Sequence, residues 1–176
     1  MRDPIVTDPE VQKQHLIGFL QQIAAMMPNG LEALLLKHGR WFHWDKDRDA
    51  KRKRGAIKQC FSNAGSRSLD QPGWYYCEGF AIGDAVIPVQ HAWLCDDSGE
   101  VWDCTWRAAG SRNARAYFGC AIKPDSVRKR ALESKYWGFF YPAGYRREPF
   151  ENDVSHFHEI GLGTGHDGRA HPAPSR

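Results

Sequence analysis

Two β-prone runs that flank residues 96–99 constrain the fold more than any other feature of this chain. Residues 89–95 and 100–106 are rich in apolar and aromatic side chains, and Asp-Asp-Ser-Gly between them is typical of a tight hairpin turn. A preceding aromatic run, 74–82, predicts a central strand. The hairpin therefore predicts antiparallel pairing in at least part of the sheet.

Helical signals surround this sheet. Asp8 and Pro9 resemble an N-cap and a first-turn proline, and apolar residues then recur at helical spacing until Pro28-Asn29-Gly30. A short helix is expected over 31–38, another over 126–135, and a third begins at Cys60, with a length that Gly65 leaves open. Helices combined with a hairpin-based sheet predict an α+β fold.

The length of 176 residues and the hydrophobic content of 41% fit one domain, expected over 1–160, with a helical N-terminal part at 1–39. The Gly- and Pro-rich tail 161–176 is predicted to be disordered. No apolar run approaches the roughly 20 residues of a membrane-spanning helix, so no membrane partner is expected. The oligomeric state cannot be predicted.

The cysteines give a prediction about the compartment. Their number, five, is odd, the N-terminus lacks the layout of a secretion signal, and no Cys-x-x-Cys pair occurs. Reduced thiols and a cytoplasmic location are therefore expected. Three of the cysteines lie in apolar contexts and are interpreted as packing residues: Cys77, Cys95 and Cys120.

Residues 40–55 combine aromatic side chains with a charge-dense stretch at 46–54, and an exposed loop or extended segment is expected there. Two interpretations remain open. The basic side chains could bind nucleic-acid phosphates while the aromatics stack on bases. The simpler interpretation is a solvated loop, favoured because Asp45, Asp47 and Asp49 offset much of the charge. The net charge of +3 neither requires nor excludes a nucleic-acid partner.

Cys60 stands where a loop turns into a helix, which suits a nucleophilic thiol. The unpaired N–H groups and the positive end of the helix dipole favour thiolate there, and the same N–H groups can bind an oxyanion. The amide of Gln59 is a further candidate oxyanion donor. Thiol catalysis also needs an imidazole and a group that orients it, and His91 and Asp103 on the two arms of the hairpin fit these roles.

Whether His91 and Asp103 share a face of the sheet depends on the length of the hairpin loop. Side chains alternate along a strand, so a loop of odd length is required. A three-residue loop, Asp97-Ser98-Gly99, satisfies this condition and places Gly99 in the left-handed position that such loops favour. His91 would then face Thr105, with Asp103 as its diagonal neighbour. A two-residue loop would separate the pair.

Several blocks resemble the transglutaminase-like branch of the papain-like thiol enzymes. That pattern runs as a cysteine at a helix start, a glycine-bearing strand, His-Ala-Trp and then Asp-x-Thr. It covers residues 57–107, and the matching blocks are Cys60-Phe61-Ser62-Asn63-Ala64, Glu78-Gly79-Phe80-Ala81, His91-Ala92-Trp93 and Asp103-Cys104-Thr105-Trp106. NlpC-like peptidases are similar in architecture, so the superfamily is better defined than the branch.

The resemblance implies a papain-like core in which the nucleophile-bearing helix packs on an antiparallel sheet. It implies acyl transfer on amides, with Cys60, His91 and Asp103 in the catalytic roles and no cofactor. Cys104 departs from the pattern because the family often has proline there. The flanking helices match nothing in the pattern, so the substrate stays open.

Other side chains near the triad have two interpretations each. Trp93 would share the face of His91 and could shield the imidazole or line a substrate groove, whereas Trp102 and Trp106 would point to the opposite face. Core packing is an equally good reading of these tryptophans. Glu78 lies in an apolar strand, where a charge needs a partner; it could fix a neighbouring loop, the favoured role, or contact substrate.

Two histidines near the C-terminus are candidate metal ligands. His156 and His158 could provide two ligands from one strand face, but no further ligands cluster at suitable spacing, so no metal is expected.

The leading hypothesis is a cysteine peptidase, amidase or transglutaminase-type enzyme that acts on a protein or peptide amide through a thioester on Cys60. The alternative is an inactive papain-like binding module that contacts nucleic acid or an acidic protein through residues 40–55. A weaker third hypothesis is an effector that modifies a host protein. Hydrolysis and transfer to an amine cannot be separated from the sequence.

Overall fold

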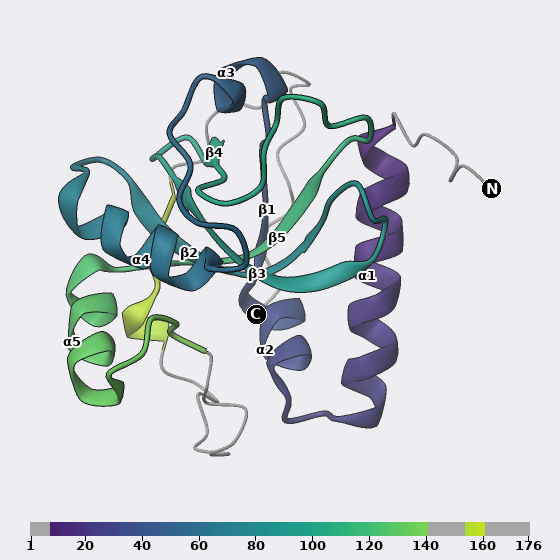
Figure 1. Ribbon diagram of the computed structural model, residues 1–176. Helices are drawn as coiled ribbons and strands as arrows, with labels where there is room; N and C mark the ends of the chain where they lie inside the picture. Colours follow the sequence, from purple (N-terminus) through teal and green to yellow (C-terminus); the bar gives the residue numbers. More distant parts are fainter. Residues whose placement is uncertain (1–7, 141–153, 161–176) are drawn as a thin grey trace.

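The protein is α+β, with a five-stranded antiparallel sheet and helices around it (Figure 1). The computed structural model describes residues 8–140 and 154–160, so the tail predicted at 161–176 lies outside the described residues. The elements in chain order are α1 (Pro9–Met26), α2 (Leu31–His38), β1 (Arg40–Phe42), α3 (Lys46–Ala50), α4 (Cys60–Asp70), β2 (Tyr75–Ile82), β3 (Pro88–Cys95), β4 (Val101–Trp102), β5 (Ala116–Ile122), α5 (Pro124–Ser134) and a 3-10 turn at Val154–His156.

The predicted helices are confirmed. The side chain of Asp8 caps α1 by accepting the N–H of Glu10 at 2.9 Å, and α2 has the predicted bounds. Cys60 is the first residue of α4, which continues through Gly65 for a further turn. Helix α5 begins two residues earlier than predicted because Pro124 occupies its first position.

The strands lie in the order β1-β5-β2-β3-β4, so β2 is the central strand, as predicted. Two strands were not predicted. Strand β5 is wholly buried between β1 and β2, and β1 lies at the start of the segment 40–55, which was expected to be an exposed loop or extended segment. Residues 40–42 are extended, whereas the short helix α3 at Lys46–Ala50 was not predicted. Residues 40–42 pair with β5, and Asp45 caps the short helix α3 by accepting two backbone N–H groups.

The hairpin has the register that the shared face of His91 and Asp103 requires. Leu94 pairs with Trp102 and Cys95 with Val101, and Asp96 N–H donates to Glu100 O. Residues 97–99 therefore form the loop, and its last residue, Gly99, has φ 81°. The three-residue loop is therefore confirmed.

The second arm of the hairpin is shorter than predicted, since β4 ends at Trp102 rather than at residue 106. The side chain of Asp103 causes this early end. Its Oδ1 accepts the backbone N–H groups of Thr105 and Trp106, each at 2.8 Å, and the chain turns away from the ladder.

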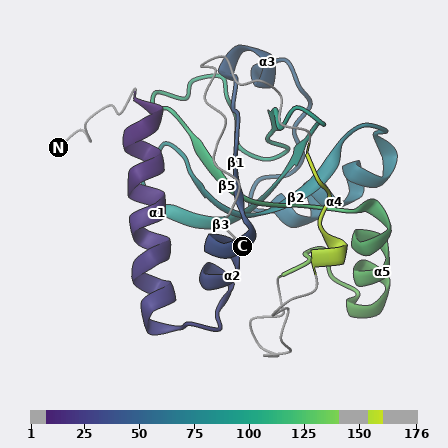
Figure 2. The same ribbon diagram turned by 180° about the vertical axis from the view of Figure 1, so that it is seen from behind.

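The sheet curls until its two edges meet. His43, directly after β1, forms a parallel bridge with Glu100, directly before β4. The backbone N–H of His43 donates to Gly99 O at 3.0 Å, and Val101 N–H donates to His43 O at 2.7 Å. The sheet therefore has an enclosed face and an outward face. Helices α1 and α5 lie at opposite sides of the molecule in the front and back views (Figure 1, Figure 2).

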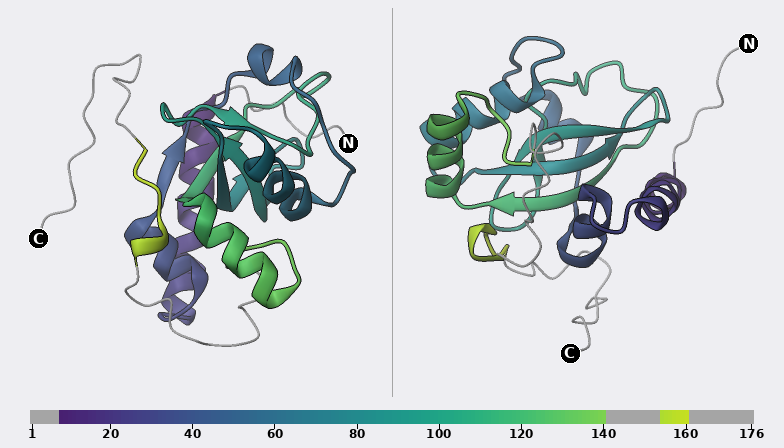
Figure 3. Two further views of the ribbon diagram at one scale, coloured as in Figure 1. Left: turned by 90° about the vertical axis from the view of Figure 1, so that its left-hand side faces the viewer. Right: turned by 90° about the horizontal axis from the view of Figure 1, so that it is seen from below.

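Two hydrophobic clusters follow from the alternation of side chains along the strands. The outer cluster joins the outward face to α1, α2, α4 and α5, which surround the sheet in the turned views of Figure 3. Its buried members include Leu16, Leu20, Leu35, Ala64, Tyr76, Phe80, Ala92, Leu94, Phe118, Ile122 and Val127. The inner cluster fills the enclosed face with Phe42, Cys77, Ala81, Trp93, Cys95, Val101, Tyr117, Ala121 and Ile160.

Two glycines let the central strands approach closely around Trp93. Gly79 of β2 pairs with Gly119 of β5. A Cβ atom on Gly79 would lie 2.3 Å from the carbonyl oxygen of Phe118, and one on Gly119 would lie 2.9 Å from the indole of Trp93. Gly119 therefore leaves room for the tryptophan, and both glycines let the backbones of β2 and β5 lie close together.

Gly79→Ala is expected to lower the free energy of unfolding by about 3 kcal/mol, because backbone atoms of β5 would have to move. The measurement is urea unfolding of the purified variant. Gly18→Ala in α1 is the matched control. Its Cβ meets nothing within 4 Å, so it should raise the free energy of unfolding by about 0.5–1 kcal/mol. Equal effects of the two substitutions would contradict this packing.

Candidate active site

Cys60 lies half-buried at the first position of α4. The side chain of Gln59, the N-cap residue, makes no capping hydrogen bond, so it leaves the N–H groups of the first turn free of a side-chain cap. Lys58, just before it, has φ 63°, a left-handed conformation that is costly for a residue with a side chain. This turn directs the chain into α4 so that Cys60 is its first residue.

His91 points into the enclosed face from β3 and is only 2% exposed. Its Nε2 lies 2.9 Å from Oδ2 of Asp103, which is fully buried. An ionised carboxylate can only accept, so Nε2 carries the proton and Nδ1 is the ring nitrogen left for another partner. The structure thus brings together His91 and Asp103 as the hairpin register predicted.

The thiol of Cys60 lies close enough to His91 to help raise the pKa of its imidazole, although α4 packs on the outer face. This is possible because β4 pairs with β3 only at Leu94 and Cys95, so the sheet is not continued beside His91. The loop before α4 is tied to the chain that follows β4, since Gly55 N–H donates to Cys104 O at 2.7 Å. The three predicted triad residues therefore meet at the edge of β3.

Asn63, one turn into α4, reinforces this junction. Its side-chain amide donates to Ala56 O at 2.7 Å and to Oγ1 of Thr105 at 2.9 Å. The nucleophile helix, the loop before it and the turn after Asp103 are therefore held by one side chain.

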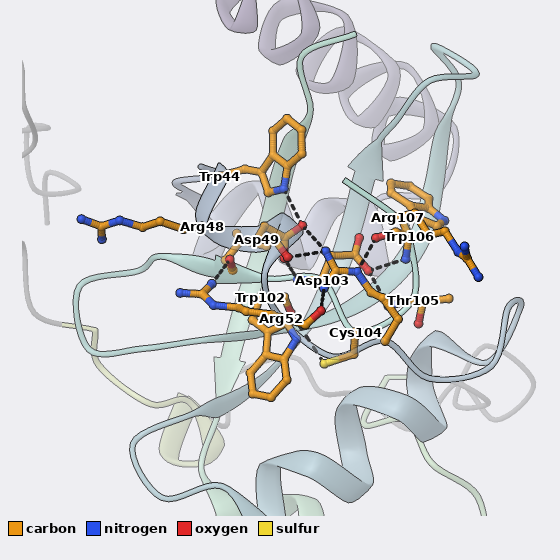
Figure 4. A network of polar contacts seen from close by, with 12 residues as sticks. Trp44, Arg48, Asp49, Arg52, Trp102, Asp103, Cys104, Thr105, Trp106 and Arg107 are labelled. Carbon is orange, nitrogen blue, oxygen red and sulfur yellow. Dashed lines mark hydrogen bonds and ion pairs between the residues drawn. The ribbon is translucent and has the colours of Figure 1, made fainter. Parts of the chain in front are cut away.

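Asp103 is the most heavily hydrogen-bonded carboxylate of the site. Its Oδ1 accepts the N–H groups of Thr105 and Trp106 (Figure 4). Its Oδ2 accepts the hydroxyl of Tyr117 at 2.8 Å in addition to His91. Burial alone would raise the pKa of Asp103, but His91 and these donors outweigh it and lower the pKa below its ordinary value. Asp103 is therefore a permanent negative charge beside the imidazole.

The charge of Asp103 acts on His91. Burial disfavours the imidazolium, but the carboxylate of Asp103, helped by Cys60, raises the pKa of His91 from 6.5 to about 9. His91 therefore carries a positive charge at neutral pH.

Trp106 covers the imidazole, which corrects the prediction that it points to the opposite face. Its ring stacks on that of His91 with centroids 4.0 Å apart and an interplanar angle of 15°. The prediction was wrong because the strand ends before residue 106, so alternation no longer applies. Trp102 does pack in the outer cluster, as predicted, edge-on to Trp74.

Trp93 shares the face of His91, as predicted, with ring centroids 6.4 Å apart. It is completely buried in the inner cluster, between Phe42 and Tyr117, and so cannot line a substrate groove. Its indole N–H has no hydrogen-bond acceptor in the described part of the chain. The shield of the imidazole is Trp106 rather than Trp93.

Glu78 points away from the triad, toward the outer cluster. Its carboxylate accepts the hydroxyl of Tyr76 at 2.7 Å and the backbone N–H groups of Phe139 and Phe140. Glu78 therefore fixes the loop after α5, which was the favoured one of its two predicted roles. Its engaged carboxylate, 2% exposed, offers no oxyanion donor and no open substrate contact.

Three residues of the site were not predicted: Tyr117, Arg115 and Asp49. Tyr117 and Arg115 belong to the chain around β5, whose apolar run Ala116–Ile122 is a strand signal that the analysis of the sequence missed. The guanidinium of Arg115 lies 3.9 Å from Oδ2 of Asp103 and stands over the ring of Trp44. It partly compensates the buried negative charge.

Three arginines of segment 40–55 form ion pairs within the protein. Arg48 and Arg52 both contact the carboxylate of Glu100, and Arg54 contacts Asp49 at 2.9 Å. Arg52 and Arg54 also donate to backbone carbonyls. The guanidinium groups of Arg52 and Arg54 are therefore engaged within the fold, whereas Arg48, Lys51 and Lys53 are exposed.

Residues 8–140 and 154–160 contain no group of three or more His, Cys, Asp or Glu side chains able to hold a metal ion. His156 lies 3.0 Å from the hydroxyl of Ser126, and His158 stacks on Tyr75 and pairs with Asp97. All five cysteines are free thiols, and the four other than Cys60 are buried.

Within the described chain, every helix is too short or too polar to cross a lipid bilayer. Comparison with models of known families, with curated proteins and with solved structures gives no match.

The raised pKa of His91 makes stability depend on pH. A group whose folded pKa lies above 6.5 stabilises the fold fully below pH 6.5, and this stabilisation is lost as pH rises through about 9. The difference corresponds to about 3 kcal/mol. The free energy of unfolding of the wild type should therefore fall by about that amount relative to His91→Gln between about pH 6 and pH 9.5. Parallel pH profiles would contradict the pairing.

Proposed function

We propose that the protein catalyses cysteine-dependent acyl transfer on amides through a Cys60–His91–Asp103 triad. The observation that carries this proposal is the geometry of His91 and Asp103, a buried carboxylate 2.9 Å from the imidazole, with the half-buried thiol of Cys60 at a helix start close enough to help raise the pKa of that imidazole. These are the three components that thiol catalysis requires. The substrate would be a protein, a peptide or another amide.

In the first step the thiolate of Cys60 attacks the amide carbonyl carbon. Free N–H groups at the start of α4 would stabilise the oxyanion, and the exposed side chain of Gln59 stays a candidate for a further donor. As the carbon–nitrogen bond breaks, the imidazolium of His91 gives its proton to the leaving amine. The products are a thioester on Cys60 and a free amine.

In the second step water or another amine attacks the thioester. His91, now neutral at Nδ1, takes the proton of the attacking group, and the thiolate leaves. Asp103 keeps the proton of His91 on Nε2 and stabilises the imidazolium in both steps. Peptidase or amidase activity and transglutaminase-type activity differ only in the attacking group.

A papain-like, transglutaminase-like fold is part of the proposal. The order of helix-start cysteine, strand histidine and following aspartate supports it, as does a nucleophile helix that packs on an antiparallel sheet. Cys104 in place of a proline and the N-terminal helices α1 and α2 are departures from the family pattern.

The alternative, an inactive module that binds nucleic acid or an acidic protein through residues 40–55, has less support. Arg52 and Arg54 are held by Glu100, Asp49 and backbone carbonyls, so their release would disrupt contacts within the fold. Steep weakening of binding with rising salt would favour this alternative.

The pH dependence of Cys60 alkylation tests the proposal. Simple labelling does not suffice, because Cys60 is the most exposed cysteine and would react first in any case. An ordinary thiol is about 0.1% ionised at about pH 5.5, whereas a thiolate–imidazolium pair stays reactive there. The rate of iodoacetamide labelling at that pH, followed by intact mass, should fall at least tenfold in His91→Ala.

Cys60→Ser is the control for the labelled site, and Asp103→Asn should also slow labelling at acidic pH. A wild-type rate that rises tenfold per pH unit, equal to that of His91→Ala, would overturn the proposal. With casein as a test substrate, hydroxylamine as the acceptor separates transfer, which forms a hydroxamate, from hydrolysis.

A further inference from the structure

The segment 44–54 places a second buried carboxylate directly behind the triad. Asp49, at the end of α3, is fully buried. Figure 4 shows its side chain between Trp44 and Asp103. Burial raises the pKa of Asp49, and the nearby charge of Asp103 acts in the same direction. Two buried carboxylates so close together are costly, so the arrangement needs a physical reason.

The reason lies in the backbone of Asp103. This residue follows the last pair of the β3–β4 ladder, so its N–H has no strand partner. Oδ1 of Asp49 accepts that N–H at 3.0 Å and takes the place of the missing strand. The bond fixes the peptide from which the side chain of Asp103 reaches His91.

The other oxygen of Asp49 is itself anchored. Oδ2 accepts the indole N–H of Trp44 at 3.0 Å and pairs with Arg54 at 2.9 Å, while the guanidinium of Arg54 also donates to the carbonyl oxygen of Asp49. Asp49 therefore has a fixed orientation, set by residues on both sides of it in the chain.

We propose that Asp49 is a positioning residue of the triad, which acts on His91 through its bond to the backbone N–H of Asp103. This inference rests on the proposed function, because it assigns to the charged segment a role in the same site. Segment 44–54 then functions as a brace for the catalytic carboxylate rather than as a ligand-binding loop.

Other charged groups also act on His91. Asp103 and Cys60 face it directly, Tyr117 and Arg115 reach it through Asp103, and each belongs to an element packed against β3 or the turn after β4. A substitution at Asp49 leaves the chemical identity of these groups unchanged and alters only the position of Asp103 and the partner of Arg54, so a change in His91 reports on those two effects.

The test is an NMR titration of the His91 ring nitrogens in the Cys60→Ala background, where no reaction can occur. Asp49→Ala removes the acceptor of the Asp103 N–H and the charge, so the proton affinity of His91 should fall about tenfold relative to the background protein. Asp49→Asn removes the charge but keeps an Oδ1 acceptor for the Asp103 N–H, so the fall should be smaller and the strongly deshielded Nε2–H resonance should persist, whereas that resonance should weaken in Asp49→Ala. If Asp49→Ala does not fold, Asp49→Ser, whose side chain is too short to keep the bond, provides the measurement.

Glu100→Gln is the matched control. The substitution removes a buried carboxylate that pairs with Arg48 and Arg52 of segment 44–54. Glu100 has no side-chain contact with Asp103 among the described residues. The substitution should lower the Tm and leave the pKa of His91 unchanged. A folded Asp49 variant with an unchanged His91 pKa, or an equal fall in Glu100→Gln, would overturn the inference. Because no thioester is involved, failure of the proposed function would appear separately, in the alkylation assay.

Discussion

The burial of the Asp103 carboxylate is the constraint around which this part of the fold is organised. A charge without solvent needs donors on every side, and here they come from the turn that follows it, from β3 and from β5. The two buried acids are each matched by a guanidinium, Asp103 by Arg115 and Asp49 by Arg54. The charges of the two acids are thus largely balanced by the arginines that pair with them.

The curled sheet makes this burial possible. Because the two edges meet at His43 and Glu100, the side chains of one face are shielded from water without a second layer. The hydrophobic side chains of the inner cluster occupy most of that space, and His91 and Asp103 lie where the ladder between β3 and β4 stops. At this position His91 and Asp103 are buried, yet His91 is still accessible to the thiol of Cys60 on α4.

Local signals were enough to predict four of the described α-helices, all but α3, together with the three-residue turn and the shared face of His91 and Asp103. Each depends on residues near one another in the sequence: a capping aspartate, a glycine with positive φ and the alternation of a strand. The position of Cys60 at a helix start belongs to the same group.

The errors have local and long-range causes. Strand β4 stops early because the side chain of Asp103 accepts backbone N–H groups two and three residues later, and this competition with the ladder turns Trp106 onto the imidazole. The bond of Asp49 to the backbone of Asp103, in contrast, spans 54 residues of sequence. The charge density of 46–54 indicated solvent, and most of its charged side chains are exposed, but Asp49 is buried by contacts that lie far away in the sequence.

The strand order has a consequence for how the chain assembles during synthesis. Strand β5 is the last strand to be made, yet it inserts between β1 and β2. A nascent chain that ends before residue 116 already carries the thiol, the imidazole and both buried acids, but their enclosure is still incomplete. The ribosome therefore releases Cys60, His91, Asp103 and Asp49 before it releases β5, the strand that completes their burial. Insertion of β5 between β1 and β2 is the step that completes the sheet around these residues.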